Sequence, residues 1–304
     1  MRSLSNARSK PLTKTQRNRI LGYIFLLPLA LIVLGFVGYP FISAIWLSFT
    51  RKYVGTPGEF IGLKNYLSLF RSDTFWLVVR NSFIYTFSSV FLKMTLGMLV
   101  AKLLVRKFIG RDVVGGIFLI SWVIPMAISA LAWKWIFQDI GGILNWIILK
   151  LHLVSRAIPF LSIPTLALSI VVIVNFWRGL PFFALSFQGA LKTIPRSQYD
   201  VAKIAGASPF QIFRYVEFPN IRSIAMIVLM LTMVWTFADF QVVWILTRGG
   251  PGNRTQVFAT YTYELAIQAG DLGLGVTVSL VMFPLLGAMI LYLTSVMSRA
   301  RKER

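Results

Sequence analysis

Residues 194–219 read IPRSQYDVAKIAGASPFQIFRYVEFP and form a polar, turn-rich stretch between two long apolar runs. Ser197 precedes Asp200 by three residues, a spacing similar to that of a capping box at the start of a helix. Gly206 stands where a residue with positive φ would end that helix. Ser208 follows two residues later and is a favourable first residue for another helix. The stretch therefore predicts two short helices joined at Gly206.

The second of these helices has both a start signal and a stop signal. Ser208 is its predicted N-cap, Pro209 its first residue, and Gln211 completes the capping box. Pro219 is expected to stop this helix before the next apolar run. The apolar runs on both sides are long enough to cross a bilayer, which takes about 20 apolar residues. The stretch is therefore a loop on one surface of a membrane.

The first predicted helix carries apolar side chains on an otherwise polar loop. A short isolated helix is only marginally stable in water. Two interpretations are therefore open: the helix docks into a groove of a partner protein, or it lies on lipid headgroups. The apolar residues are Tyr199, Val201, Ala202, Ile204 and Ala205.

The whole chain has the composition of a polytopic membrane protein. It has 304 residues, of which 57% are hydrophobic and 13% charged, and its mean hydropathy is +0.72. Soluble domains carry about 25% charged residues, and a chain this apolar does not stay solvated as a disordered one. The sequence has no cysteine and one histidine, His152. This excludes a disulfide, a cysteine nucleophile and a multi-histidine metal centre.

Six stretches are long and apolar enough to predict an all-α membrane protein with six transmembrane helices. We expect the fourth span to be interrupted at Gly179-Leu180-Pro181. Together the spans form one transmembrane domain over residues 20–298, with the 194–219 loop between the fourth and fifth spans. The predicted spans are 20–49, 82–105, 114–137, 163–185, 221–246 and 273–298.

The basic residues predict the orientation of these spans. The chain has 31 Lys and Arg against 10 Asp and Glu, a net charge of +21. Basic residues gather in the tails 1–19 and 299–304 and in the connections that follow the second and fourth spans. Cytoplasmic segments of membrane proteins are enriched in Lys and Arg. Both termini and the 194–219 loop are therefore predicted to be cytoplasmic, and the charge does not indicate a nucleic-acid partner.

Polar residues inside the apolar spans are candidates for a solute pathway. A hydroxyl-rich solute crossing hydrocarbon would leave polar groups unpaired, so a pathway must offer hydrogen-bond partners and stacking faces. A broken helix near the midplane is a recurring place for a solute site. The candidate pathway residues are Asn175, Trp177, Arg178, Trp235, Thr236, Asp239 and Gln241.

The charged candidates also have structural interpretations. Asp239 either contacts solute or links helices as a hydrogen-bond hub, and Lys93 in the second span either lines the pathway or joins two helices. A direct pair between Arg178 and Asp239 is not expected. By the span limits their depths differ by about eight residues, or about 12 Å at 1.5 Å per residue. Arg178 and Lys93 would favour an acidic saccharide as the solute.

The 194–219 loop resembles the signature loop of the inner-membrane permease subunits of binding-protein-dependent ABC importers. That signature has Ile-Pro, then Tyr-Glu-Ala-Ala, then Asp-Gly-Ala, then Phe and Pro at fixed offsets. Three positions depart from it: Asp200 replaces Glu, Val201 replaces Ala, and Ala205 replaces Asp. The matching residues are Ile194, Pro195, Tyr199, Ala202, Gly206, Ala207, Phe213 and Pro219.

Three further segments bring the resemblance closest to maltose-permease-like subunits of carbohydrate uptake systems. Residues 246–255, LTRGGPGNRT, are similar to the Thr-x-Gly-Gly-Pro-x-x-x-Thr turn of sugar-type permeases. Residues 60–66, FIGLKNY, resemble the segment that follows their first span, and residues 141–145, GGILN, resemble the turn after the third. Taken alone, Gly249-Gly250-Pro251 indicates only a tight turn at a membrane surface.

The resemblance implies a multi-pass permease subunit in the bacterial inner membrane, forming half of a pathway that imports a sugar or oligosaccharide by alternating access. The implied partners are a related second permease in a heterodimer, an ATPase dimer, an extracytoplasmic solute-binding protein and membrane lipid. The chain has no Walker A motif. We therefore expect no enzyme activity and no cofactor on this chain, with ATP and magnesium bound by the ATPase. The implied ATPase-coupling residues are Ser197, Tyr199, Asp200, Ala202, Lys203, Gly206, Ala207 and Phe213.

Two other classes of membrane protein were weighed against this one. A secondary, ion-coupled transporter is the alternative, with Asp239 as its coupling carboxylate. Such a transporter should have an internal repeat and several intramembrane carboxylates, and Asp239 is the one clear case. A membrane enzyme is disfavoured because no predicted span contains His or Cys.

Overall fold

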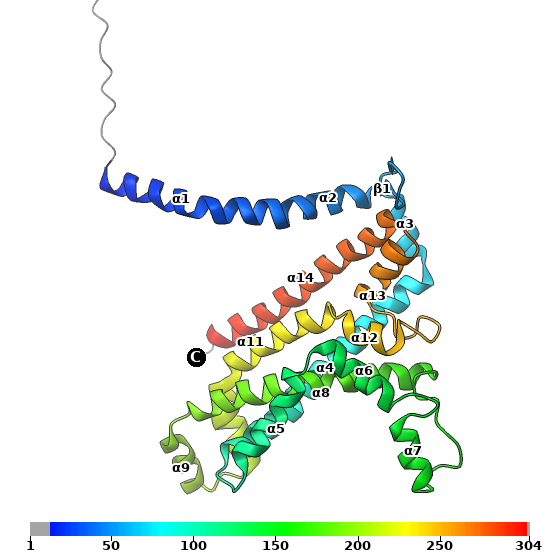
Figure 1. Cartoon of the computed structure of the whole chain (residues 1–304). Coiled ribbons are helices and arrows are strands. Elements are labelled where there is room, and N and C mark those ends of the chain that lie inside the picture. The colour runs from blue at the N-terminus through cyan, green and yellow to red at the C-terminus, as the bar shows by residue number, and fades with distance from the viewer. Residues whose placement is uncertain (1–12, 303–304) are drawn as a thin grey trace, which may run out of the picture.

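The computed structural model describes residues 13–302, with side chains for residues 13–295, and this part of the chain is almost entirely helical (Figure 1). Residues 1–12 and 303–304 of the predicted tails lie outside the described residues. A two-stranded antiparallel sheet, three π-helical turns (η1 to η3) and fourteen α-helices make up the described chain. The elements are α1 (Lys14–Val33), η1 (Leu34–Gly38), α2 (Tyr39–Ser48), β1 (Thr50–Arg51), β2 (Glu59–Phe60), α3 (Lys64–Arg71), α4 (Asp73–Val105), α5 (Arg111–Val123), α6 (Met126–Ile136), α7 (Ile143–Lys150), α8 (Pro164–Lys192), α9 (Arg196–Ile204), α10 (Pro209–Ile212), η2 (Phe213–Glu217), α11 (Phe218–Phe237), α12 (Gln241–Thr247), α13 (Phe258–Tyr263), η3 (Glu264–Gln268) and α14 (Leu272–Lys302).

The six predicted spans correspond to five long apolar helices and one bent helix pair among the described residues. The first begins at Lys14, inside the predicted tail, and the last continues past residue 298 to Lys302. Figure 1 places the start of α1, the end of α14 and α9 at the same end of the molecule. The cytoplasmic location of that end remains a prediction.

The third span is not the single helix predicted for residues 114–137. It consists of α5 and α6, which meet at an angle of 97°. Ile124, between them, is extended, with φ −62° and ψ 130°. The ring of Pro125 disfavours helical geometry at the preceding residue, so the chain turns here although both halves are apolar. The break exposes the end of α5 and the start of α6 to the centre of the bundle.

The predicted interruption at residues 179–181 is wrong, because α8 runs unbroken through Pro181. Instead, the fifth span breaks: α11 ends at Phe237 and α12 begins at Gln241. Asp239 lies in this break, and its Oδ1 accepts a hydrogen bond from the backbone N–H of Val242 at 3.4 Å. A carboxylate that bonds nearby backbone in this way competes with helix formation. The fifth span therefore breaks at its acidic residue.

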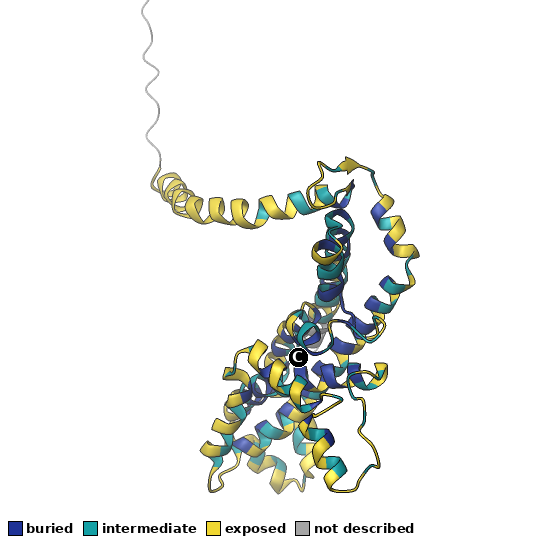
Figure 2. Cartoon of the chain, turned by 45° about the vertical axis from the view of Figure 1, so that its right-hand side comes forward, coloured by how far each residue is buried: buried dark blue, intermediate teal, exposed yellow. Residues whose placement is uncertain are grey.

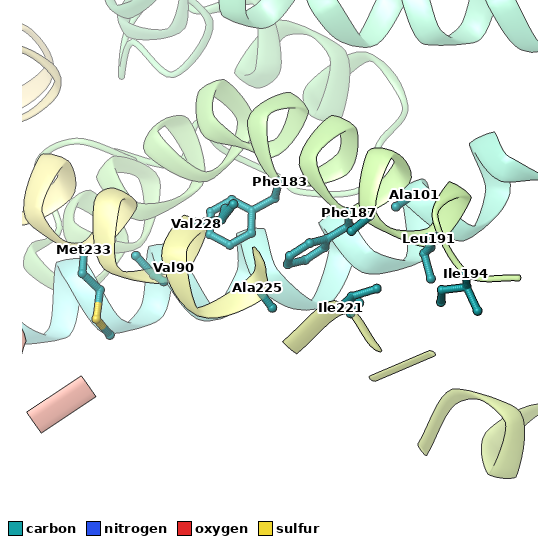
Figure 3. Packing of buried hydrophobic residues seen from close by; sticks show 11 residues of the cluster. Val90, Ala101, Phe183, Phe187, Leu191, Ile194, Ile221, Ala225, Val228 and Met233 are labelled. Atoms are coloured by element: carbon teal, nitrogen blue, oxygen red, sulfur yellow. The ribbon is translucent and has the colours of Figure 1, made fainter. Parts of the chain in front are cut away.

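The bundle centres on the packing of α4 against α8, with α11 alongside. Figure 3 shows the cluster at their junction, where Phe183 and Phe187 of α8 lie between residues of α4 and α11. The close approach of α4 to α8 depends on Gly97 of α4, where an added Cβ would lie 2.6 Å from the Cβ of Phe183. A larger residue there would force the two central helices apart.

The first span stands apart from this bundle. Helix α1 and η1 extend as an arm (Figure 1), and the arm is almost wholly exposed (Figure 2). Contact with the body begins near the start of α2, where the rings of Phe41 and Phe283 of α14 lie 5.5 Å apart. Trp46 stacks on Phe60 of β2 at the same junction. An apolar, unpacked helix of this length is a large exposed hydrophobic surface.

Candidate functional site

A cavity of about 360 Å³ opens where the breaks in the third and fifth spans face α4 and α8. All the predicted pathway residues line it except Trp177, which packs edge-on against Trp133 at 5.4 Å between ring centroids. Thr236 and Asp239 are buried, whereas Trp235 is exposed toward the cavity. The lining residues are Lys93, Trp122, Met126, Asn175, Arg178, Gly179, Phe182, Thr232, Trp235, Thr236, Ala238, Asp239, Phe240 and Gln241.

A buried hydrogen-bond network crosses three helices behind this cavity. Lys93 Nζ of α4 donates to Asn175 Oδ1 of α8 at 2.5 Å and to Thr236 Oγ1 of α11 at 3.2 Å. Asn175 Nδ2 in turn donates to Asp239 Oδ2 at 2.9 Å, and the Tyr85 hydroxyl donates to the same oxygen at 2.6 Å. Asn175 therefore bridges a buried cation and a buried carboxylate. Charges in a membrane interior persist when they are compensated in this way.

Gly179 has a steric role in this network rather than the helix-breaking role predicted for it. A Cβ at Gly179 would lie 2.5 Å from Lys93 Cε, so a larger residue would displace the lysine chain from its course against α8. Lys93 passes this point to reach Asn175 one turn earlier on α8. The Gly-Leu-Pro segment thus admits a side chain from a neighbouring helix while α8 continues.

The guanidinium of Arg178 has no such compensation. No carboxylate of the described residues lies within ion-pairing distance of it, and its Nε is buried without a hydrogen-bond partner. Arg178 and Asp239 line the same cavity, but no ion pair joins them in the described chain. Arg178 is thus a cation on the cavity wall that has no partner among the described residues.

An aromatic cluster forms another wall. Phe182 of α8 lies 6.0 Å from Trp122 of α5 and 5.5 Å from Trp235 of α11, measured between ring centroids. Sequence reasoning missed Trp122, Phe182 and Tyr85. Tyr85 and Lys93 belong to a polar stripe at four-residue spacing on α4, together with Asn81 and Ser89. That helical stripe is the signal that could have found Tyr85, whereas Trp122 and Phe182 lie on other helices and show no such pattern.

The predicted helix joint at Gly206 is confirmed. Gly206 has φ +73°, its N–H donates to the carbonyl of Lys203 at 3.0 Å, and the Ala207 N–H donates to the carbonyl of Ala202 at 2.9 Å. These are the two bonds of a Schellman motif. The capping box of Ser208 and Gln211 is also present. The joint therefore places α9 and α10 in a defined relation.

Two other local predictions in this loop are wrong. Helix α9 begins at Arg196 with Pro195 as its N-cap, so Ser197 lies inside the first turn and caps nothing. Proline fixes φ near −65°, which already suits a helix start. Pro219 does not stop the second helix, because residues 209–237 form one continuous span. The π-helical turn η2 ends at Glu217, two residues before Pro219, and its wider geometry accommodates the proline ring.

The inner side of the loop is anchored to the bundle. Glu217 of η2 is buried and lies 2.8 Å from Lys102 Nζ at the end of α4. Lys102 also lies over the ring of Phe213, 5.2 Å from its centroid. Burial, with a contribution from the nearby negative charge of Glu217, raises the pKa of Tyr199 on α9. The ends of α4 and α11 and the inner face of α9 therefore meet at one point.

The outer side of the loop carries three of the five predicted apolar residues, Val201, Ile204 and Ala205, together with Phe210. Val201 is 66% exposed, Ile204 88% and Phe210 70%. Asp200, Lys203 and Gly206 are exposed as well, whereas Tyr199, Ala202, Ala207 and Phe213 are half-buried. The predicted loop residues thus divide between an outward face and the anchor.

The turn at residues 247–256 is closed by its own threonines at the other end of the molecule. Thr247 and Thr255 are hydrogen-bonded through their hydroxyls at 2.7 Å, and Thr255 Oγ1 donates to the carbonyl of Gly250 at 2.6 Å. Asn81 Nδ2 of α4 donates to the carbonyls of Asn253 and Gln256, both at 3.2 Å. This explains both threonines in the sequence pattern.

The family model of binding-protein-dependent transport system inner membrane components matches residues 93–301. The chain belongs to this family. It is 34% identical over 252 residues to the probable ABC transporter permease protein y4oQ of Sinorhizobium fredii, covering 82% of this chain and 81% of the relative. It is 32% identical over 279 residues to the trehalose/maltose transport system permease protein MalF of Thermococcus litoralis, covering 91% and 94%.

A solved structure confirms the fold of this permease. A chain of a bacterial ABC transporter involved in the import of the acidic polysaccharide alginate superposes with a TM-score of 0.81 at 20% identity, covering 94% of this chain and 98% of that one. The permease is a multi-pass protein of the inner membrane. The family decides against the ion-coupled alternative, so Asp239 is not retained as an ion-coupling site.

The ion pair beneath the permease's loop gives a stability prediction. Lys102→Met should lower the free energy of unfolding by about 2 kcal/mol, because it leaves Glu217 buried without a cation. The loss is below that of a fully buried pair, since the Lys102 side chain is 29% exposed. Adding Glu217→Gln should recover most of it. Thermal unfolding of the two single variants and the double variant in detergent measures the coupling; additive effects would contradict it.

Proposed function

We propose that this permease forms half of a pathway that carries a sugar or oligosaccharide into the cytoplasm by alternating access. The observation that carries the proposal is the central cavity, where an amide, hydroxyl groups and aromatic faces converge at two helix breaks. Sugars need hydrogen-bond partners for their hydroxyls and apolar faces for their rings. The printed name of the Thermococcus litoralis relative, a trehalose/maltose permease, supports the same class of solute.

The energy comes from a separate ATPase dimer, which binds ATP and magnesium, and this chain binds no cofactor and catalyses no reaction. The absence of a Walker A motif in the sequence supports this division of labour. Val201 and Ile204 present the exposed apolar face of α9 that such a partner would receive. The anchor of η2 on α4 and α11 would pass motion of the loop to the spans that line the cavity.

A related second permease completes the pathway in a heterodimer. The support is the arm formed by α1 and η1, in which α1 has no buried residue. Residues of α1 and η1 expose large apolar side chains on all sides, and contact with the body begins only at Phe41 in α2. A surface of this kind marks an interaction site. An extracytoplasmic solute-binding protein delivers the solute.

The test is purification of the complex through a tag on this chain, followed by reconstitution in liposomes. Mass spectrometry should find an ATPase with a Walker A motif and a permease homologous to this one. The complex should import radiolabelled saccharide when Mg-ATP is enclosed and not when a non-hydrolysable analogue replaces it. A chain that purifies alone and moves solute without ATP would overturn the proposal.

A further inference from the structure

The central cavity holds more positive than negative charge. Lys93 and Arg178 line it, and Asp239 is the one carboxylate among its lining residues. Lys93 is 3% exposed and Asp239 7% exposed, so both side chains are buried in the cavity wall. The surrounding helices cross the membrane, where an uncompensated charge is costly. The wall therefore carries one positive charge beyond what its own carboxylate balances.

The carboxylate of Asp239 is already committed to partners other than Arg178. Its Oδ2 accepts from Tyr85 and Asn175, and its Oδ1 accepts from the backbone of Val242. Through Asn175 it also compensates Lys93. The excess charge thus belongs to Arg178, whose Nε is buried without a hydrogen-bond partner. A guanidinium in this state matches a carboxylate, sulfonate or phosphate in a bidentate geometry.

We propose that the cavity takes a saccharide carrying an anionic group, with Arg178 binding that group and the aromatic wall of Trp122, Phe182 and Trp235 receiving the sugar ring. The inference rests on the proposed function and adds the charge class of the solute. Lys93 and Asp239 hold the network and do not determine this choice. A carboxylate of the second permease is the competing partner for Arg178, and the experiment separates the two.

The first measurement needs no knowledge of the natural solute. The reconstituted complex without solute is compared with its Arg178→Gln variant by thermal unfolding, with Lys134→Gln, a half-buried cation outside this cavity, as the control. If Arg178 awaits an anion, its removal should leave the melting temperature unchanged or raise it. A fall of several degrees, absent from Lys134→Gln, would mean that a protein carboxylate already pairs with Arg178, which would overturn the proposal.

The second measurement is binding to the complex in detergent without the solute-binding protein, so that selection by that protein does not enter. The probes are glucuronate, glucose 6-phosphate and 6-deoxy-6-sulfoglucose, with glucose as the neutral reference. At least one anionic probe should bind at least tenfold more tightly than glucose, and Arg178→Gln should remove this difference. Absence of any anionic preference, including absence of binding, would overturn the inference. ATP-driven import of a neutral sugar by the same complex would leave the proposed function standing.

Discussion

Proline in place of Gly206 should reduce solute uptake to less than a tenth while the spans stay folded. Gly206 has φ +73°, and its N–H donates to the carbonyl of Lys203. Proline fixes φ near −65° and has no N–H, so the substitution removes the conformation and the bond together. The two short helices on either side then lose their fixed relation. Motion of the ATPase would no longer reach η2 and α11, because α9 would no longer be rigidly joined to them.

Gly206→Asn is the matched control for this prediction. Asparagine adopts the left-handed conformation more readily than other side-chain-bearing residues, and nothing lies within 4 Å of a Cβ at this position. The Gly206→Asn variant should keep more than half of the normal solute uptake. Uptake and ATP hydrolysis are measured in the same proteoliposomes, and circular dichroism checks the helical content. Coupled uptake at the normal rate in Gly206→Pro would show that the joint transmits nothing.

The spans were predictable from the sequence because hydropathy alone marks a helix that crosses a membrane. The breaks within the spans were not predictable from the sequence, as two prolines illustrate. Pro125 breaks the third span, whereas Pro181 lies within a continuous α8. Both follow an apolar residue in an apolar run. Whether the residue before the proline stays helical depends on the packing of neighbouring helices, which a single sequence does not display.

The candidate site was likewise predictable only in part. Seven pathway residues were proposed because they are polar or aromatic inside spans, and six of them share one cavity. Asp239 as a hydrogen-bond hub and Lys93 as a link between helices were among the predicted alternatives. Their partners were not predicted, because the network joins residues from three separate spans. In the loop, the joint at Gly206 followed from local rules alone, since its bonds lie within six residues. The start of α9 did not, because two local signals, Pro195 and Ser197, competed there.

Asp239→Asn should destabilise the permease by roughly 3 kcal/mol, because it leaves Lys93 buried without a negative charge. The asparagine keeps the shape of the side chain and can still accept hydrogen bonds from Tyr85 and Asn175. The loss is therefore mainly that of the charge, with the weak 3.4 Å bond from the Val242 N–H lost as well, because the amide nitrogen takes the place of Oδ1. The loss of stability lies at the low end of the values for broken buried ion pairs, because Asn175 separates the two charged groups. Uptake should fall as well, because residue 239 lines the cavity and loses its charge.

The rescue variant distinguishes charge compensation from packing. Lys93→Met removes the cation and keeps an unbranched chain that passes Gly179, where the lysine chain now lies. Combined with Asp239→Asn, it should recover at least half of the lost stability, because neither charge is then buried alone. Unfolding of both single variants and the double variant in mixed detergent micelles closes the cycle. Additive losses would mean that Asp239 acts through hydrogen bonds alone, and that the cation on α4 is compensated by other means.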